Sequence, residues 1–168
     1  MTPDTFTIQF MTTIQNEFLT ALSKSISIVT ETAVLLTLGL IISLFLSYKY
    51  SKRKGIIYTS SLILTGIIIY TAKEIFHRAR PITSLIAETG FSFPSGHATM
   101  STVFFLFLAS LLSKKYPKRK IASYTIAIIL ITIVSLSRLY LQVHYLTDIL
   151  GGIFIGLIIF LTSIKFLR

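Results

Sequence analysis

The chain has 168 residues, of which 53% are hydrophobic and 13% are charged, and its formal net charge is +10 at pH 7. The apolar residues form long uninterrupted blocks, which are typical of helices that cross a lipid bilayer and exclude an ordinary soluble domain. The basic residues stand in short clusters between these blocks. We therefore interpret them as determinants of membrane topology and do not expect a nucleic-acid partner.

The first segment, residues 6 to 31, carries apolar and polar side chains at helical spacing on opposite sides. One side holds Phe10, Ile14, Phe18, Leu22, Ile26 and Val29, and the other holds Thr13, Asn16, Glu17, Thr20, Lys24 and Ser27. This pattern predicts an amphipathic helix that lies at the membrane surface or packs against the bundle, and it leaves open a weak first span.

Five apolar blocks follow, each with roughly the length that a hydrocarbon layer of about 30 Å requires. They are Thr32 to Tyr48, Ile56 to Ala72, His97 to Leu112, Ile121 to Ser137 and Asp148 to Phe166. We predict an all-α membrane bundle of five to six transmembrane helices. We expect one domain over residues 1–168, with an amphipathic or weakly spanning part at 1–31 and a core bundle at 32–168.

Most of the sixteen basic residues follow the first, third and fifth spans. They are Lys49, Lys52, Arg53, Lys54, Lys114, Lys115, Lys118, Arg119, Lys120, Lys165 and Arg168. The positive-inside rule assigns these residues and the C-terminus to the cytoplasmic side of the inner membrane. The connections at 73–96 and 138–147 would then lie on the extracytoplasmic face.

Four further cations, Lys73, Arg78, Arg80 and Arg138, lie at the edges of spans on that face. An unpaired cation costs roughly 2.5 to 3.5 kcal/mol at a helix centre, so such a cluster is tolerated only near the interface or around an anion. On a helix continuing to Pro81, Lys73 and Arg80 would stand two turns apart on one face and could clamp a phosphate. A simple rim position is the alternative for each cation by itself.

The turn that opens the third span contains Ser95, Gly96 and His97. Serine is a preferred N-cap residue, and glycine lets a ligand approach the backbone, so the free N–H groups of this helix start would suit an anion. His97 could present a ring nitrogen to the same anion. A capped helix with a structural histidine is the alternative.

The second polar connection brings Arg138, His144 and Asp148. If the last helix has begun by His144, the histidine and the aspartate share a face, and the carboxylate can hold one ring N–H. A carboxylate that orients an imidazole is a recurring way to make a nucleophile or a base. The alternative is that Asp148 only stabilises the helix N-terminus.

These residues resemble the three signature motifs of the type 2 phosphatidic acid phosphatase (PAP2) superfamily, in its bacterial membrane lipid phosphatase branch. The matching positions are Lys73, Arg80 and Pro81, then Pro94, Ser95, Gly96 and His97, then Ser137, Arg138, His144 and Asp148. The resemblance implies a lipid phosphatase with His144 as the nucleophile that forms a phosphohistidine, Asp148 as its orienting group and His97 as the acid and base. It implies that Lys73, Arg80, Ser95, Gly96 and Arg138 hold the phosphate, with neither a metal nor another cofactor.

The substrates that the resemblance suggests are undecaprenyl pyrophosphate, phosphatidylglycerol phosphate and the 1-phosphate of lipid A. A noncatalytic lipid-headgroup binder or scramblase on the same scaffold is the competing interpretation. The presence of His144 favours the enzyme. The sequence does not determine the oligomeric state.

Several features remain outside the motifs. For His77 we expect a structural or rim role, and for Arg78 a headgroup contact. The loop from Ile82 to Gly90 is a candidate lid, and Gly152 with Gly156 predicts a close helix crossing inside the bundle.

Overall fold

The computed structural model describes residues 1–166, and every regular element in that part of the chain is helical. The helices are α1 (Pro3–Thr13), α2 (Glu17–Val29), α3 (Thr32–Lys49), α4 (Lys52–Phe76), α5 (Gly96–Lys115), the 3-10 helix η1 (Pro117–Arg119), α6 (Lys120–Tyr140) and α7 (Leu146–Lys165). Arg168, predicted to close the cationic end, lies outside the described residues.

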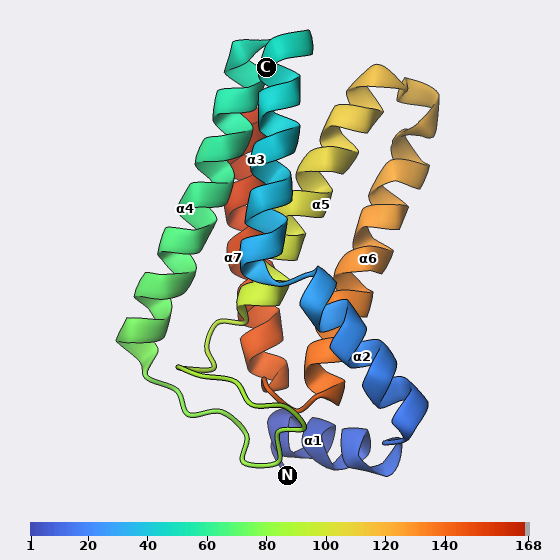
Figure 1. Cartoon of the computed structure of the whole chain (residues 1–168), viewed down its shortest axis with the longest axis vertical. Helices are drawn as coiled ribbons and strands as arrows, with labels where there is room; N and C mark the ends of the chain where they lie inside the picture. Colours follow the sequence, from blue (N-terminus) through green and yellow to red (C-terminus); the bar gives the residue numbers. More distant parts are fainter. Residues whose placement is uncertain (167–168) are drawn as a thin grey trace.

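The five long helices α3 to α7 confirm the predicted spans, with bounds that differ by a few residues. Each is long and apolar enough to cross a membrane, and α6 does so together with η1. The two N-terminal helices have 11 and 13 residues, which is short of the roughly 20 residues that a transmembrane helix needs. The protein is therefore an all-α bundle with five candidate spans and two short helices beside them (Figure 1).

Helix α5 lies at the centre of the bundle, where it packs against α3, α4, α6 and α7 (Figure 1). Hydroxyl groups in this buried helix are satisfied by its own carbonyls, as when Thr102 Oγ1 donates to Ala98 O at 2.7 Å. Such internal bonds remove the cost of burying a hydroxyl group. Small and polar residues can therefore pack inside this apolar bundle.

The predicted close crossing lies between α5 and α7. A Cβ atom added at Gly152 would stand 2.8 Å from Thr99 Oγ1 and 2.9 Å from Ser95 O, and one added at Gly156 would stand 2.7 Å from Thr102 Cβ. Only glycine lets the two backbones approach this closely. As a consequence, the start of α5 touches the start of α7, and Ser95 N donates to Asp148 O at 3.1 Å.

The prediction of one continuous helix over residues 6–31 is wrong, because the chain breaks between Thr13 and Glu17. Asn16 is the N-cap of α2, and its Oδ1 accepts from Leu19 N at 2.9 Å. The Tyr140 hydroxyl fixes the break by accepting from Asn16 N and donating to Asn16 O, at 2.9 and 3.0 Å. The side-chain cap and the tyrosine satisfy the polar groups that a helix break exposes.

Helix α2 has the predicted two-sided character. Its polar residues Ser23 and Ser27 are buried, whereas Phe18 and Leu22 are 74% and 44% exposed. These two serines thus face the bundle, whereas the charged Glu17 and Lys24 and the large apolar Phe18 and Leu22 are exposed. This arrangement brings a serine of the N-terminal segment into the interior.

Candidate active site

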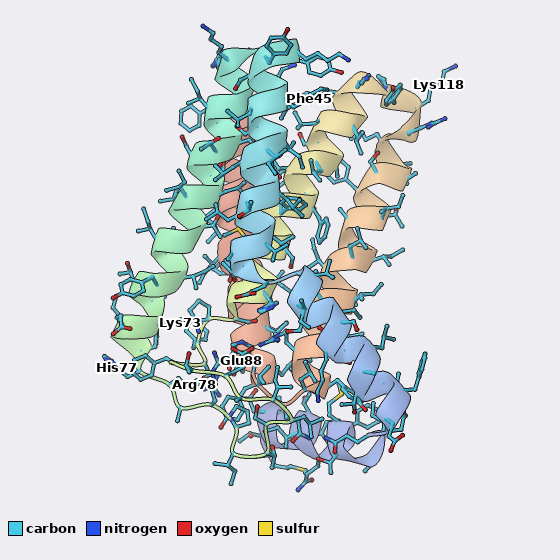
Figure 2. All side chains as sticks on the ribbon, viewed as in Figure 1. Phe45, Lys73, His77, Arg78, Glu88 and Lys118 are labelled. Atoms are coloured by element: carbon cyan, nitrogen blue, oxygen red, sulfur yellow. The ribbon has the colours of Figure 1, made fainter. Side chains whose placement is uncertain are left out.

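A cavity of about 420 Å³ opens at the end of the bundle that carries the N-terminus. Figure 2 shows Lys73 and Glu88 at this end and Lys118 at the opposite end. Residues from all three motifs line the cavity, together with Glu88: Lys73, Arg80, Gly96, His97, Arg138 and His144. Ser95 and Asp148 are fully buried and are not among the lining residues.

Lys73 and Arg80 reach the cavity by a different route from the one predicted. Helix α4 ends at Phe76, and His77 adopts the left-handed conformation with φ of 46°, so the two cations do not share a helix face. Lys73 Nζ donates to Phe91 O, while Arg80 donates to Gly90 O at 3.1 Å and to Val143 O at 2.8 Å. Carbonyls of the following loops therefore orient the phosphate-binding candidates.

His144 lies just before α7, so it does not share a helix face with Asp148 as predicted, yet the two side chains still meet. His144 Nδ1 is 3.6 Å from Asp148 Oδ2, and His144 Nε2 is 3.3 Å from Arg80 Nη1. Because a guanidinium only donates, Nε2 is the acceptor in this contact and Nδ1 carries the ring proton. The lone pair of His144 Nε2 therefore points toward the Arg80 guanidinium.

Burial sets the protonation state of His144. The side chain is 2% exposed, and burial lowers the pKa of His144 to about 4, even though Asp148 acts in the opposite direction. The charge of Arg80 adds to the lowering of this pKa. The imidazole is therefore neutral at pH 7, as a nucleophile requires.

His97 contacts an element that the sequence analysis did not connect with the site. Its Nε2 lies 3.1 Å from the carbonyl oxygen of Ser27, in the last turn of α2. A carbonyl only accepts, so His97 Nε2 carries a proton, and it satisfies one of the free carbonyls of a helix C-terminus. Arg138 Nη1 also donates to Ser27 Oγ. The spacing of Ser23, Ser27 and Thr30 along one side was the only signal for this contact.

Glu88, which the sequence analysis placed only in the candidate lid, lies among the phosphate-binding candidates. Its Oε1 is 2.5 Å from Arg138 Nη2, and its Oε2 is 3.7 Å from Arg80 Nη2. Burial by itself raises the pKa of Glu88, but the hydrogen bond and charge of Arg138 outweigh it and lower this pKa below its usual value. A charged carboxylate thus occupies the cationic part of the cavity.

The two residues outside the motifs differ in position. His77 is exposed and does not line the cavity, and its ring makes a T-shaped contact with the lining residue Phe91, with centroids 4.4 Å apart. The Arg78 guanidinium lies between two carboxylates, 2.5 Å from Asp148 Oδ1 and 2.7 Å from Asp4 Oδ2. Arg78 therefore has protein partners where a headgroup contact was expected.

Curated proteins resemble this chain over part of their length. Phosphatidylglycerophosphatase B of Bacillus subtilis (strain 168) is 41% identical over 92 residues, which are 52% of this chain and 45% of that protein. Probable lipid phosphate phosphatase beta of Arabidopsis thaliana is 29% identical over 133 residues, which are 64% of this chain and 61% of that protein. Both matches span less than two thirds of the relative.

Solved structures resemble the whole bundle. The crystal structure of a transmembrane PAP2-type phosphatidylglycerolphosphate phosphatase from Bacillus subtilis matches with a TM-score of 0.90 and 29% identity, over 97% of this chain and 83% of that chain. Aquifex aeolicus LpxE matches with a TM-score of 0.78 and 21% identity, over 98% of this chain and 96% of that chain, and supports the fold alone. The family model of the PAP2 superfamily matches residues 54–168. The chain therefore belongs to the PAP2 superfamily.

Proposed function

We propose that this protein is a membrane phosphatase that hydrolyses the phosphate monoester or diphosphate of a membrane lipid through a phosphohistidine. The observation that carries the proposal is the position of the buried His144, whose Nε2 lies 3.3 Å from Arg80 Nη1 in a cavity that Lys73 and Arg138 also line. A nucleophile surrounded by fixed cations suits attack on a phosphorus atom.

In the first step, Arg80 Nη1 moves from His144 Nε2 to a phosphate oxygen, and Nε2 attacks phosphorus while the bond from phosphorus to the leaving oxygen breaks. Asp148 holds the Nδ1–H side of the ring, and His97 gives a proton to the leaving oxygen. Because His97 Nε2 is bound to Ser27 O, Nδ1 is the nitrogen that exchanges this proton. In the second step, His97 takes a proton from water, which attacks the phosphohistidine and releases inorganic phosphate.

Lys73, Arg80 and Arg138 would bind the phosphate oxygens, together with the N–H of Gly96 at the start of α5. Ser95 caps this helix, since its Oγ accepts from Ala98 N at 3.5 Å. Three cations and a helix N-terminus supply the charge stabilisation that Mg²⁺ supplies in other phosphoryl transfers. The reaction would therefore need no metal. For a phosphate to bind Arg138 and Arg80, the Glu88 carboxylate must move away from them.

The cavity lies at one end of the spans, so it suits a phosphate group that a lipid already holds at the membrane surface. Phosphatidylglycerol phosphate is the first substrate to test, because the names of two relatives refer to it. The lysine-rich end of the bundle would be cytoplasmic, and the cavity would then lie on the extracytoplasmic face. We also propose that the helices form one domain, because four of the long helices pack around α5.

The proposal is tested by phosphate release from phosphatidylglycerol phosphate, undecaprenyl pyrophosphate and lipid A 1-phosphate in detergent, with a chelator present. Glu17→Gln, an exposed change on α2, is the matched control for His144→Ala. We expect release by the intact protein and by the control, and none by His144→Ala. Failure of the intact protein on every lipid would favour a noncatalytic headgroup binder, and a need for divalent metal would contradict the mechanism.

A further inference from the structure

We infer that Arg78, held by Asp4 of the N-terminal helix α1, is a positioning residue that orients Asp148 toward His144. This inference rests on the proposed role of His144. It makes α1 part of the catalytic apparatus, although α1 contributes no residue to the lining of the cavity.

The Asp148 carboxylate is fully buried and its two oxygens have different partners. Arg78 Nη1 lies 2.5 Å from Oδ1, whereas Tyr145 N donates to Oδ2 at 2.9 Å. Oδ2 lies 3.6 Å from His144 Nδ1. Arg78 thus fixes the rotation of the carboxylate and balances its charge, which a buried carboxylate requires.

Asp4 fixes the guanidinium in turn. Its Oδ2 lies 2.7 Å from Arg78 Nη2, and its two oxygens accept from Thr147 N at 3.0 Å and from Thr147 Oγ1 at 2.8 Å. Burial would raise the pKa of Asp4, but the bonds from Thr147 and Arg78 lower it. Because Thr147 N is in the first turn of α7, Asp4 also satisfies a free N–H of the helix that carries Asp148.

A second set of bonds fastens α1 to the loop that carries His144. Gln142 Nε2 donates to Ile8 O at 3.2 Å and to Thr12 Oγ1 at 2.8 Å. The Arg78 guanidinium also lies over the Tyr145 ring, 4.2 Å from its centroid. Helix α1 is therefore bound to Gln142, which precedes His144 in the sequence, and to Thr147, which follows it. These bonds couple the position of α1 to that of the imidazole.

Arg78 is absent from the cavity lining, so its removal should impair the chemical step more than phosphate binding. The other charged groups that act on His144 and Asp148 are Arg80, Arg138 and Lys73. These three groups line the cavity, so their removal would change phosphate binding as well. This difference separates a positioning residue from a binding residue.

The experiment compares Arg78→Gln, Arg78→Lys, Asp4→Asn and the double variant with Glu17→Gln as control, on phosphatidylglycerol phosphate in detergent. We expect Arg78→Gln to lower kcat at least tenfold, with KM and inhibition by inorganic phosphate unchanged. Arg78→Lys should recover part of kcat. Asp4→Asn should lower kcat less, and the double variant should be no worse than Arg78→Gln, because Asp4 acts through Arg78.

The ¹⁵N NMR signals of the imidazoles provide a readout that does not need turnover, and the chain has only three histidines. We expect Arg78→Gln to shift the His144 signals and to leave those of His77 in place. A wild-type kcat in Arg78→Gln would overturn the inference. So would a fall in kcat with unchanged His144 signals and no recovery by lysine. If the intact protein releases no phosphate from any lipid, the proposed function fails and the His144 signals alone decide the inference.

Discussion

The Glu88 carboxylate lies 2.5 Å from the Arg138 guanidinium and also pairs with Arg80 at 3.7 Å. Arg138 is fully buried at the end of α6, whereas Glu88 is half-buried in the irregular connection between α4 and α5. The carboxylate therefore bridges two cations that would bind a phosphate. An incoming phosphate and this side chain would compete for the same hydrogen-bond donors.

Replacement of Glu88 by glutamine should strengthen the binding of inorganic phosphate. A partly exposed ion pair stabilises the protein by up to about 1 kcal/mol, and phosphate must displace the pairs of Glu88 in order to bind. Without them, the inhibition constant of phosphate should be roughly fivefold lower. The inhibition constant of phosphate in the release assay measures this effect, with Glu17→Gln as the control. Unchanged or weaker inhibition in Glu88→Gln would contradict the competition.

The pH dependence of kcat/KM should report the buried environment of His144. Because burial lowers the pKa of His144 to about 4 from 6.5, the nucleophile stays neutral through pH 5 and 6. Activity should fall on the acid side only as the pH approaches about 4, where His144 takes up a proton. An acid limb centred near 6.5 would show that His144 is exposed to water in the active protein.

The same pKa predicts how stability depends on pH. The unfolded chain binds a proton at His144 below pH 6.5, whereas the folded protein does so only near pH 4. The unfolded state therefore binds more protons in this window, and the free energy of unfolding should decrease as the pH falls from 6.5 to 4. Unfolding in detergent at several pH values measures this slope, which should be smaller in His144→Ala.

Replacement of Arg80 by lysine keeps the charge but removes the planar set of donors. Arg80 Nε contacts Gly90 O, and its Nη1 contacts both Val143 O and His144 Nε2. An ammonium group cannot reproduce this planar set of donors. We expect kcat/KM to fall by about 10² to 10³, as for the loss of one donor to a developing oxyanion. Arg53→Lys, exposed in the first turn of α4, is the matched control. Equal activity of both variants would argue against a phosphate contact at Arg80.

Replacement of Gly152 by alanine should separate the starts of α5 and α7. The added Cβ atom would lie 2.9 Å from Ser95 O. Such overpacking lowers the free energy of unfolding by roughly 1 to 3 kcal/mol. Thermal unfolding in detergent should show this loss, and activity should fall because Ser95 N binds Asp148 O. Gly66→Ala, where the added Cβ has nothing within 4 Å, is the control for stability. Equal melting temperatures of the two variants would exclude a tight crossing.

The boundaries of the long helices were predictable because the thickness of a bilayer imposes a length on every apolar block. The motif residues were recognisable for another reason, since they match three known motifs, in order and at fixed spacing. Where the prediction depended on a helix continuing, it failed. Lys73 and Arg80 lie on either side of the left-handed His77, and His144 precedes the helix that carries Asp148. A local turn cancels the periodicity on which such arguments depend.

The sequence by itself therefore determined the class of the protein, its spans and the residues that we propose to carry the chemistry. Only the tertiary structure decided which groups surround those residues. Ser27 meets His97 across 70 residues of sequence, Arg78 meets Asp148 across 70, and Asp4 meets Arg78 across 74. Hydrophobic patterns record which side of a helix is buried, but the packing of one helix against another determines which polar groups meet in the interior.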